Sequence, residues 1–489
     1  MMNIFNIKNL LFAAMMLLTS SSFTSCGSSD ETSMPQQIKQ YFDKDITLKN
    51  AGNHTSAYFD LSDGVVLAYK NKDAASFLNA TVQKLTSNDS CQVFSLADDK
   101  ITPLKLKQTK LYNKIMDTGS YVQQMAPIEK TLDKIVRDGK SSLLVTDFEE
   151  FTPDRQVQHQ SFATRYFTNW LKQGNDITFF VFDFIGERNI PYHLYFIVFD
   201  NKSHQFLNKI KESAVGITSY QEFHLSTDAY SVSTSYPSAS QGGNYHDAET
   251  GEDLVTGVME DGSETAYTNY GQGARLEYYP LGVSWEDALK NSEEAKQAGF
   301  NPRYTALFRN LFFDFSNQDS YIIKKLAVKV TDVEEDFQQY ALYQKVLADK
   351  EKSASYYDEN GKMLAEFDYK ENQSKPAEIK DLLILDQDLF AQSMAQSNGK
   401  KAEIGIIFSP QFKGNIIGGE QGDLLRIDVT IAESQPNLSA RLDQLFSWGA
   451  NNNLRDAIRN TLQELNPVGT VIYLSLIHIS EPTRRYAIS

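Results

Sequence analysis

Residues 176–184 read DITFFVFDF, residues 193–200 read HLYFIVFD, and a third apolar run, SSLLVTDF, occupies residues 141–148. The three runs are almost continuously apolar and do not alternate. That pattern is typical of strands that are buried on both faces, as in a parallel sheet covered by helices. Shorter strand candidates precede them, namely TSAYFDL at 55–61 and CQVFSL at 91–96.

Amphipathic segments separate these strand candidates. We expect helices at Asp73–Lys84, Tyr121–Asp138 and Ser161–Lys172. A β-α-β-α alternation predicts an α/β domain with a doubly wound, mostly parallel sheet over residues 51–230.

The remaining body has a different composition. Residues 231–273 are rich in Gly, Ser, Thr and acidic residues, which indicates a linker or long loop. From 274 to 473, several apolar strand candidates precede a helix candidate at Asn453–Leu465. We interpret this part as a largely antiparallel β region with a terminal helix.

The N-terminus has the layout of a secretory signal. Lys8 precedes an apolar run from Leu10 to Leu18, and small residues lead to Cys26. The run is about nine residues long, whereas roughly twenty are needed to span a bilayer. We therefore predict a cleaved signal peptide at 1–25 and a polar tether at 26–50.

The residues before Cys26 resemble the lipobox of bacterial lipoproteins, although Phe23 stands where Leu is usual. Asp30 and Glu31 resemble the acidic export tag of Bacteroidetes lipoproteins. These resemblances imply a lipid on Cys26 and an outer-membrane, cell-surface location. The alternative is an ordinary signal peptide with a chance cysteine.

The C-terminal stretch LSLIHISEPTR, at 474–484, resembles a translated sequencing adapter. We expect residues 474–489 to be non-native, and scars of this kind are set aside in fold reasoning. The alternative is a genuine strand at Val471–Ile479.

Composition limits the partners. The net charge of -16 argues against nucleic acid, because phosphate binding needs a basic face. The two cysteines leave no internal disulfide once Cys26 is lipidated.

Oxygen-bearing side chains follow two of the predicted parallel strands. Asp60 and Ser62 lie at the end of the first, Asp147 lies at the end of the third run, after Thr146, and Thr118 lies in a loop between them. Ligands in open α/β sheets bind where the carboxyl ends of strands meet, so we expect these four side chains to converge. Carboxylate and hydroxyl oxygens suit Mg²⁺ or Ca²⁺.

This arrangement resembles the von Willebrand factor A domain, whose metal-dependent adhesion site uses an Asp-x-Ser-x-Ser strand end, a later Thr and a later Asp. Asp60, Ser62, Thr118 and Asp147 match four of these positions, and Gly64 replaces the last serine. The resemblance implies a site that binds a protein or glycan partner through a cation. The alternative is a metal-free domain in which the two aspartates cap or turn the chain.

We expect no enzyme activity. The chain has no phosphate loop, HExxH, CxxC or GxSxG pattern, and its histidines are scattered without zinc-ligand spacing. Each histidine is therefore expected to be a surface or strand residue. Two alternatives to a binding role remain, a structural component of an envelope assembly and a metal-dependent hydrolase.

Overall fold

The computed structural model describes residues 40–41, 44, 54–227, 315–411 and 423–467 with short gaps, together with strands between 231 and 314 and at 470–477. Cys26, the signal peptide, most of the tether and the tail beyond residue 477 lie outside the described residues. Among the described residues, no helix is long and apolar enough to cross a membrane.

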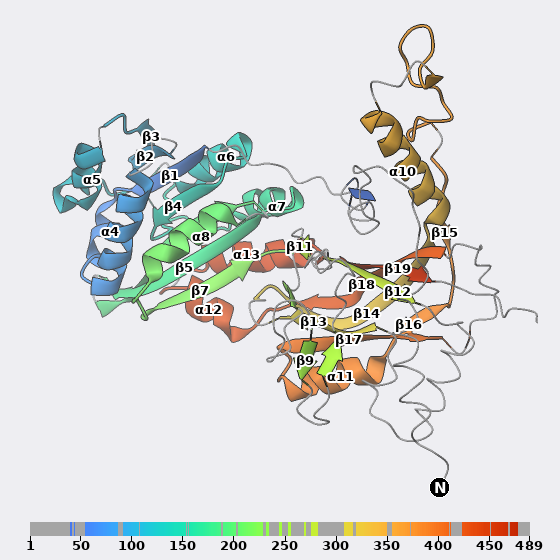
Figure 1. Ribbon diagram of the computed structural model, residues 1–489. Coiled ribbons are helices and arrows are strands. Elements are labelled where there is room, and N and C mark those ends of the chain that lie inside the picture. Colours follow the sequence, from blue (N-terminus) through green and yellow to red (C-terminus); the bar gives the residue numbers. More distant parts are fainter. Residues whose placement is uncertain are drawn as a thin grey trace, which may run out of the picture.

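A seven-stranded sheet forms the first part of the molecule (Figure 1). Its strands are β1 (Thr55–Asp60), β2 (Cys91–Ala97), β3 (Lys100–Pro103), β4 (Ser142–Thr146), β5 (Asp176–Ile185), β6 (Pro191–Asp200) and β7 (Tyr220–Leu225). They lie in the order β3-β2-β1-β4-β6-β5-β7.

The sheet is mixed, and this corrects part of the expectation. β2, β1 and β4 are parallel neighbours, and β5 points the same way, so four of the seven strands share one direction. However, β5 and β6, two of the apolar runs expected to be parallel, form an antiparallel hairpin. Only residues 186–190 connect them. A parallel crossover needs a dozen residues or more, so this short connection permits only an antiparallel pair.

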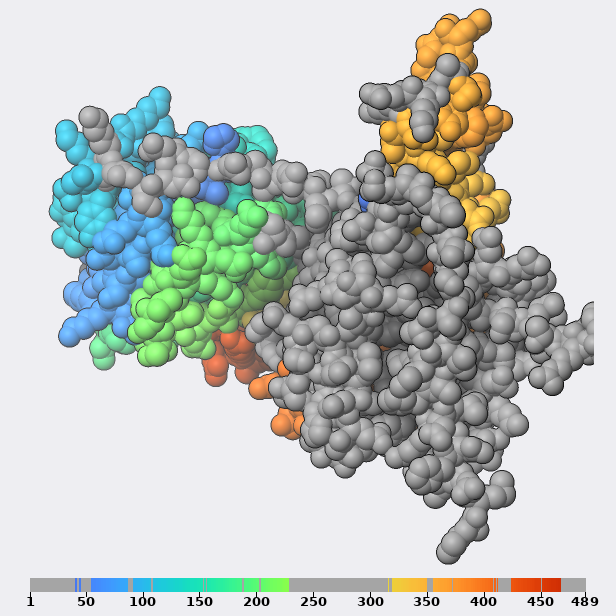
Figure 2. Space-filling model, viewed as in Figure 1, coloured from blue at the N-terminus to red at the C-terminus, as the bar shows by residue number. Residues whose placement is uncertain are grey.

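Helices cover both faces of this sheet, as the apolar runs indicated. They are α3 (Asp63–Ala68), α4 (Lys72–Thr86), α5 (Gln108–Met116), α6 (Ile128–Asp138), α7 (Thr164–Lys172) and α8 (Gln205–Lys211), with short 3-10 turns η2 (Thr118–Ser120) and η4 (Glu212–Ala214). Side chains alternate between two cores: Phe59 and Phe180 pack with the α3, α4 and α8 side, and Tyr58 and Phe179 with the α6 and α7 side. The space-filling view shows the blue surface of α4 beside the green surface around α8 (Figure 2).

The second part is largely antiparallel, as expected. Its strands are β8 (Ser231–Ser233), β9 (Asn244–His246), β10 (Asp253–Val255), β11 (Thr268–Asn269), β12 (Arg275–Leu281), β13 (Phe308–Asp314), β14 (Tyr321–Asp332), β15 (Ala377–Glu378), β16 (Leu383–Leu385), β17 (Lys401–Phe408), β18 (Asp423–Pro436) and β19 (Thr470–Ile477). They form a six-stranded sheet, a four-stranded sheet and a hairpin. Its helices are α10 (Glu334–Ala348), α11 (Gln387–Gln396), α12 (Ala440–Phe446) and α13 (Asn453–Glu464). β19 includes the first residues of the tail that we predict to be non-native, and pairing alone does not test that prediction.

The two parts share one core. α12 and α13, although late in the sequence, lie on the same face of the first sheet as α7 (Figure 1). Phe446 of α12 is fully buried, and its ring lies 5.1 Å from that of Phe179 and 5.0 Å from that of Phe223. Tyr195 of β6 donates its hydroxyl to the Leu445 carbonyl at 2.9 Å. The expected terminal helix therefore exists, and it covers the α/β sheet.

Part of the expected tether contacts α10, which projects away from the β sheets (Figure 1). Tyr41 is buried, and its hydroxyl donates to Asp336 Oδ2 at 2.6 Å. Tyr369 donates to the same carboxylate at 2.8 Å. A segment from before the first strand is thus attached to the second part of the protein.

Candidate functional site

Asp60 and Asp147 lie at the carboxyl ends of the neighbouring parallel strands β1 and β4, and we call them the carboxylate pair. β1 passes almost directly into α3, because only Leu61 and Ser62 separate strand from helix. All three polar side chains are enclosed, with exposures of 1% for Asp60, 5% for Ser62 and 3% for Asp147. The structure therefore brings together three of the four predicted ligands.

Neutral donors hold Asp60 in place. Its Oδ1 accepts the backbone N–H of Ser62 at 2.8 Å, and its Oδ2 accepts the Thr146 hydroxyl at 2.7 Å. The Ser62 side chain also hydrogen-bonds to Asp60. Thr146, a residue not singled out from the sequence, in turn accepts the backbone N–H of Phe148 at 2.9 Å.

The backbone after β4 is strained. Phe148 has a φ of 62°, a left-handed conformation that bulky residues rarely adopt. Its ring is fully buried and stacks on Phe162 with ring centroids 5.5 Å apart. Such strain costs on the order of 1–3 kcal/mol and is concentrated at functional sites. Here the packed ring fixes the turn that carries Asp147 and Glu149.

Burial is the main cause of altered protonation at the carboxylate pair. It raises the pKa of Asp60 to about 6, against hydrogen bonds from Ser62 and Thr146 that lower it. The pKa of Asp147 is raised further, first by burial and then by the charges of Asp60 and Glu149. Two carboxylates that share a desolvated site cannot both ionise cheaply, unless a cation joins them.

The two glutamates after Asp147 differ in role. Glu149 accepts a hydrogen bond from the Trp448 indole at 3.4 Å, and burial raises its pKa. Glu150 accepts the backbone N–H of Glu129 at 2.7 Å, in the first turn of α6, where the helix dipole favours an acid. Glu149 therefore adds charge near the carboxylate pair, and Glu150 caps a helix.

Gly64 occupies the position where the adhesion motif has its last serine. A Cβ atom built there would lie 2.7 Å from Asp147 Oδ2, too close for a real contact. The missing side chain is thus replaced in space by the Asp147 carboxylate.

Thr118 is exposed on η2. The loop that follows reaches the site, because the Asp63 N–H donates to the Gln123 carbonyl at 2.8 Å and Ser62 bridges to Gln123. No hydrogen bond among the described residues joins Thr118 to the carboxylate pair. Its role as a ligand stays a prediction.

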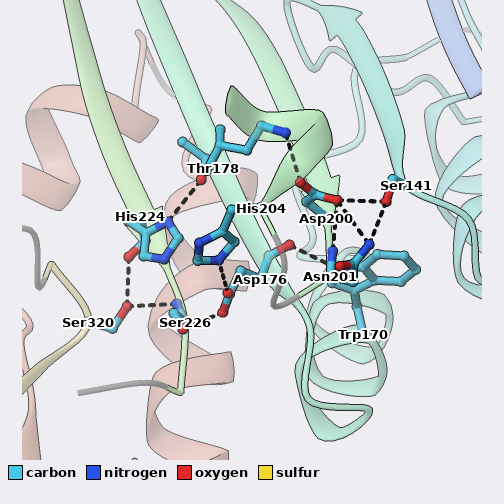
Figure 3. Close-up of polar contacts among 11 residues, drawn as sticks. Ser141, Trp170, Asp176, Thr178, Asp200, Asn201, His204, His224, Ser226 and Ser320 are labelled. Carbon is cyan, nitrogen blue, oxygen red and sulfur yellow. Dashed lines mark hydrogen bonds and ion pairs between the residues drawn. The ribbon is translucent and has the colours of Figure 1, made fainter. Parts of the chain in front are cut away.

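A second polar group lies where β5 begins and β6 and β7 end. This edge of the sheet is opposite to the one formed by the carboxyl ends of β1 and β4. Asp176, His204 and His224 each offer one ligand atom there, and these atoms lie within 4.8 Å of one another. We call them the histidine group (Figure 3). The described part of the chain therefore contains residues that could hold a metal ion, although they differ from those expected.

Sequence reasoning missed the histidine group because its members are far apart in the chain and belong to different elements. Asp176 begins β5, His204 precedes α8, and His224 lies in β7. The residue separations follow no metal-binding motif, so only the antiparallel pairing of β5 with β6 and β7 brings the three side chains together.

Comparison with known proteins does not place this chain in a family. No family model matches it, and no characterised protein and no solved structure is significantly similar to it.

Proposed function

We propose that this protein is a cell-envelope lipoprotein whose α/β domain, similar to von Willebrand factor A domains, binds a protein or glycan partner through Mg²⁺ or Ca²⁺ held at the carboxylate pair. The observation that carries the proposal is the enclosure of Asp60 and Asp147 at adjacent strand ends. The charged groups that act most strongly on the pKa of either are acidic, namely Glu149 on Asp60, and Asp60 and Glu149 on Asp147. A divalent cation would supply the missing positive charge.

The chemistry of the surroundings suits a hard cation. Asp60, Asp147 and Ser62 supply oxygen atoms, and water can complete the shell of Mg²⁺ or Ca²⁺. Zinc is less suited, because it prefers nitrogen and sulfur ligands. We propose that the remaining coordination position accepts a carboxylate from the partner, on the side of the loop that contains the exposed Val122.

The rim of the site also offers an apolar contact. Val122 is 69% exposed and directly precedes Gln123, which pairs with Ser62. An exposed apolar side chain beside a cation is suited to contacts around a partner's carboxylate. We therefore place the partner across α3 and the loop that contains Val122.

The test is a thermal melt of the EDTA-treated protein with and without millimolar Mg²⁺ or Ca²⁺. A cation that binds only the folded state raises the melting temperature by mass action. Asp60→Ala should abolish the rise, and Asp133→Ala, at an exposed acid paired with Arg137 on α6, should keep it. Equal melting of the wild type with and without cation, together with no heat of binding in calorimetry, would overturn the cation site.

The anchor has a separate test. Cys26→Ala should move the protein from the membrane fraction to the soluble fraction and remove its lipid label. Unchanged fractionation would overturn lipidation. Protease treatment of intact cells should remove a surface binder, and survival of the protein would instead favour a structural component inside the envelope.

A further inference from the structure

We infer that the histidine group is a transition-metal site suited to Zn²⁺, independent of the carboxylate pair. Asp176, His204 and His224 come from three separate elements and converge at the amino end of β5. Figure 3 shows the two imidazole rings beside each other, next to Asp176. Their ring centroids are 5.9 Å apart and the ring planes are nearly perpendicular.

The three ligand atoms favour a transition metal over Mg²⁺ or Ca²⁺. Two imidazoles and one carboxylate are ligands that Zn²⁺ takes in tetrahedral sites, usually with water in the fourth position. Mg²⁺ and Ca²⁺ prefer oxygen ligands, so they favour the carboxylate pair instead. The two edges of the sheet therefore select different ions.

The pair His204 and Asp176 needs only a small side-chain movement, and the ligand atom of His224 lies within 4.8 Å of both. His204 Nε2 lies 2.6 Å from Asp176 Oδ2, a hydrogen-bond distance. Two ligands on a tetrahedral zinc lie about 3.3 Å apart, given bonds of about 2.0–2.2 Å. Binding would replace the proton between these atoms with the metal and separate them by less than about 1 Å.

Hydroxyl groups orient two of the three ligands. The Thr178 hydroxyl lies 2.8 Å from His224 Nδ1, and the Ser226 hydroxyl donates to Asp176 Oδ1. Partners of this kind fix the ring orientation and the basicity of metal ligands, and their loss typically costs 10–100-fold in metal affinity. Thr178 is thus a positioning residue.

The backbone at the third ligand is also specialised. His204 has a φ of 51°, in the left-handed region, and is the N-cap residue of α8. The Asp200 carboxylate accepts the Leu207 N–H at 2.7 Å in the first turn of that helix, and its charge interacts with His204. The left-handed residue turns the chain so that its imidazole faces Asp176, which is only 1% exposed.

The second part of the protein closes this edge. Asp319 accepts the His224 N–H at 3.0 Å and pairs with Arg441 of α12, and Ser320 bonds to the His224 carbonyl at 2.9 Å. Zinc at the histidine group would therefore tie β5, β7 and the start of α8 together at the contact between the two parts.

The experiment uses the full chain after EDTA treatment and dialysis. Calorimetry with Zn²⁺ should show one site per chain, and Co²⁺ should give the visible absorption of a tetrahedral complex. His204→Gln and His224→Gln should each raise the dissociation constant at least tenfold, and Thr178→Val about tenfold. His193→Gln is the control, because His193 is bonded to Asp183 at the edge of the sheet away from the histidine group. It should leave the dissociation constant for Zn²⁺ unchanged.

Two results would overturn the inference: no zinc binding below millimolar concentration by the wild type, or unchanged binding in the folded double variant of His204 and His224. His204 has a side-chain exposure of 35%, so its variant should fold, and circular dichroism checks this. Asp60→Ala should retain zinc binding, which keeps this test separate from that of the carboxylate pair.

Discussion

Each edge of the seven-stranded sheet contains a buried aspartate at a strand end, but the surroundings differ. At one edge, Asp60 faces a second carboxylate and is held by hydroxyl and backbone donors. At the other edge, Asp176 is bonded to an imidazole and a serine hydroxyl. We therefore expect the charge of Asp60, beside the acidic Asp147, to lower the free energy of unfolding. We expect the charge of Asp176, beside the His204 imidazole, to raise it.

The largest expected effect is at the histidine group. Asp176→Asn keeps the shape of the side chain but removes the charge bonded to His204. The amide oxygen can accept only one of the two hydrogen bonds that the carboxylate accepts from His204 and Ser226, so we expect the free energy of unfolding to fall by about 3 kcal/mol. Urea unfolding at pH 7 in EDTA measures this. A variant as stable as the wild type would show that the two edges do not differ in the proposed way.

Asp60→Asn should act in the opposite direction. In the folded protein the pKa of Asp60 is raised from 3.8 to about 6. Between these values the unfolded chain has released the proton and the folded chain retains it. The contribution to stability is thus complete below pH 3.8 and is lost as pH rises through about 6.

That loss amounts to on the order of 2–3 kcal/mol, and the asparagine variant avoids it. In EDTA, the variant should therefore exceed the wild type in stability at pH 7 but not at pH 4. Urea unfolding across this range provides the measurement. A difference between variant and wild type that does not change with pH would contradict the cause assigned to the pKa.

A smaller effect should come from Gly64→Ser. The new Cβ displaces Asp147, which costs about 1 kcal/mol without cation. The added hydroxyl restores an oxygen ligand, so Mg²⁺ or Ca²⁺ should bind about tenfold more tightly, a gain of about 1.4 kcal/mol. Gly64→Ala is the matched control, because it causes the same displacement and adds no ligand. Equal cation affinity in both variants would exclude the serine position from the site.

The smallest effect on stability is expected for Thr118→Ala. The residue is exposed, so the cation-free melting temperature should change by no more than that of an ordinary surface variant, within about 0.5 kcal/mol. If Thr118 reaches the cation through the loop that ends at Gln123, the cation-induced rise in melting temperature should shrink. An unchanged rise would remove Thr118 from the predicted ligands.

The sequence was sufficient for the apolar strands and for the meeting of Asp60 with Asp147, because both follow from local pattern and from the edge where parallel strands end. It also contained a signal that we misinterpreted. The connection at 186–190 is too short for a crossover, so β5 and β6 could have been predicted as a hairpin. The apolar character of both strands had suggested parallel neighbours.

Other features depend on tertiary packing that no local pattern encodes. The amphipathic face of α13 predicts a helix but does not specify which sheet it covers. Likewise, the sequence presents Thr146 as an ordinary strand residue. Its hydrogen bond to Asp60 follows only from the adjacency of β1 and β4. The histidine group required the pairings of β5 with β6 and of β5 with β7 to be known at once.

The attachment of Tyr41 to α10 has a mechanical consequence. If Cys26 is lipidated, 41 − 26 = 15 residues separate the lipid from this contact, and a fully extended chain of that length spans about 50 Å. A pull on a partner bound at the carboxylate pair would pass through the shared core and reach the membrane by way of β14, α10 and Tyr41. β14 pairs with β18 along its length, from Tyr321 to Asp332. Under load, this ladder and the contact of Gln40, Tyr41 and Lys44 with α10 act in series. The contact has far fewer hydrogen bonds than the ladder, so it should break first and release the tether before the sheets unfold.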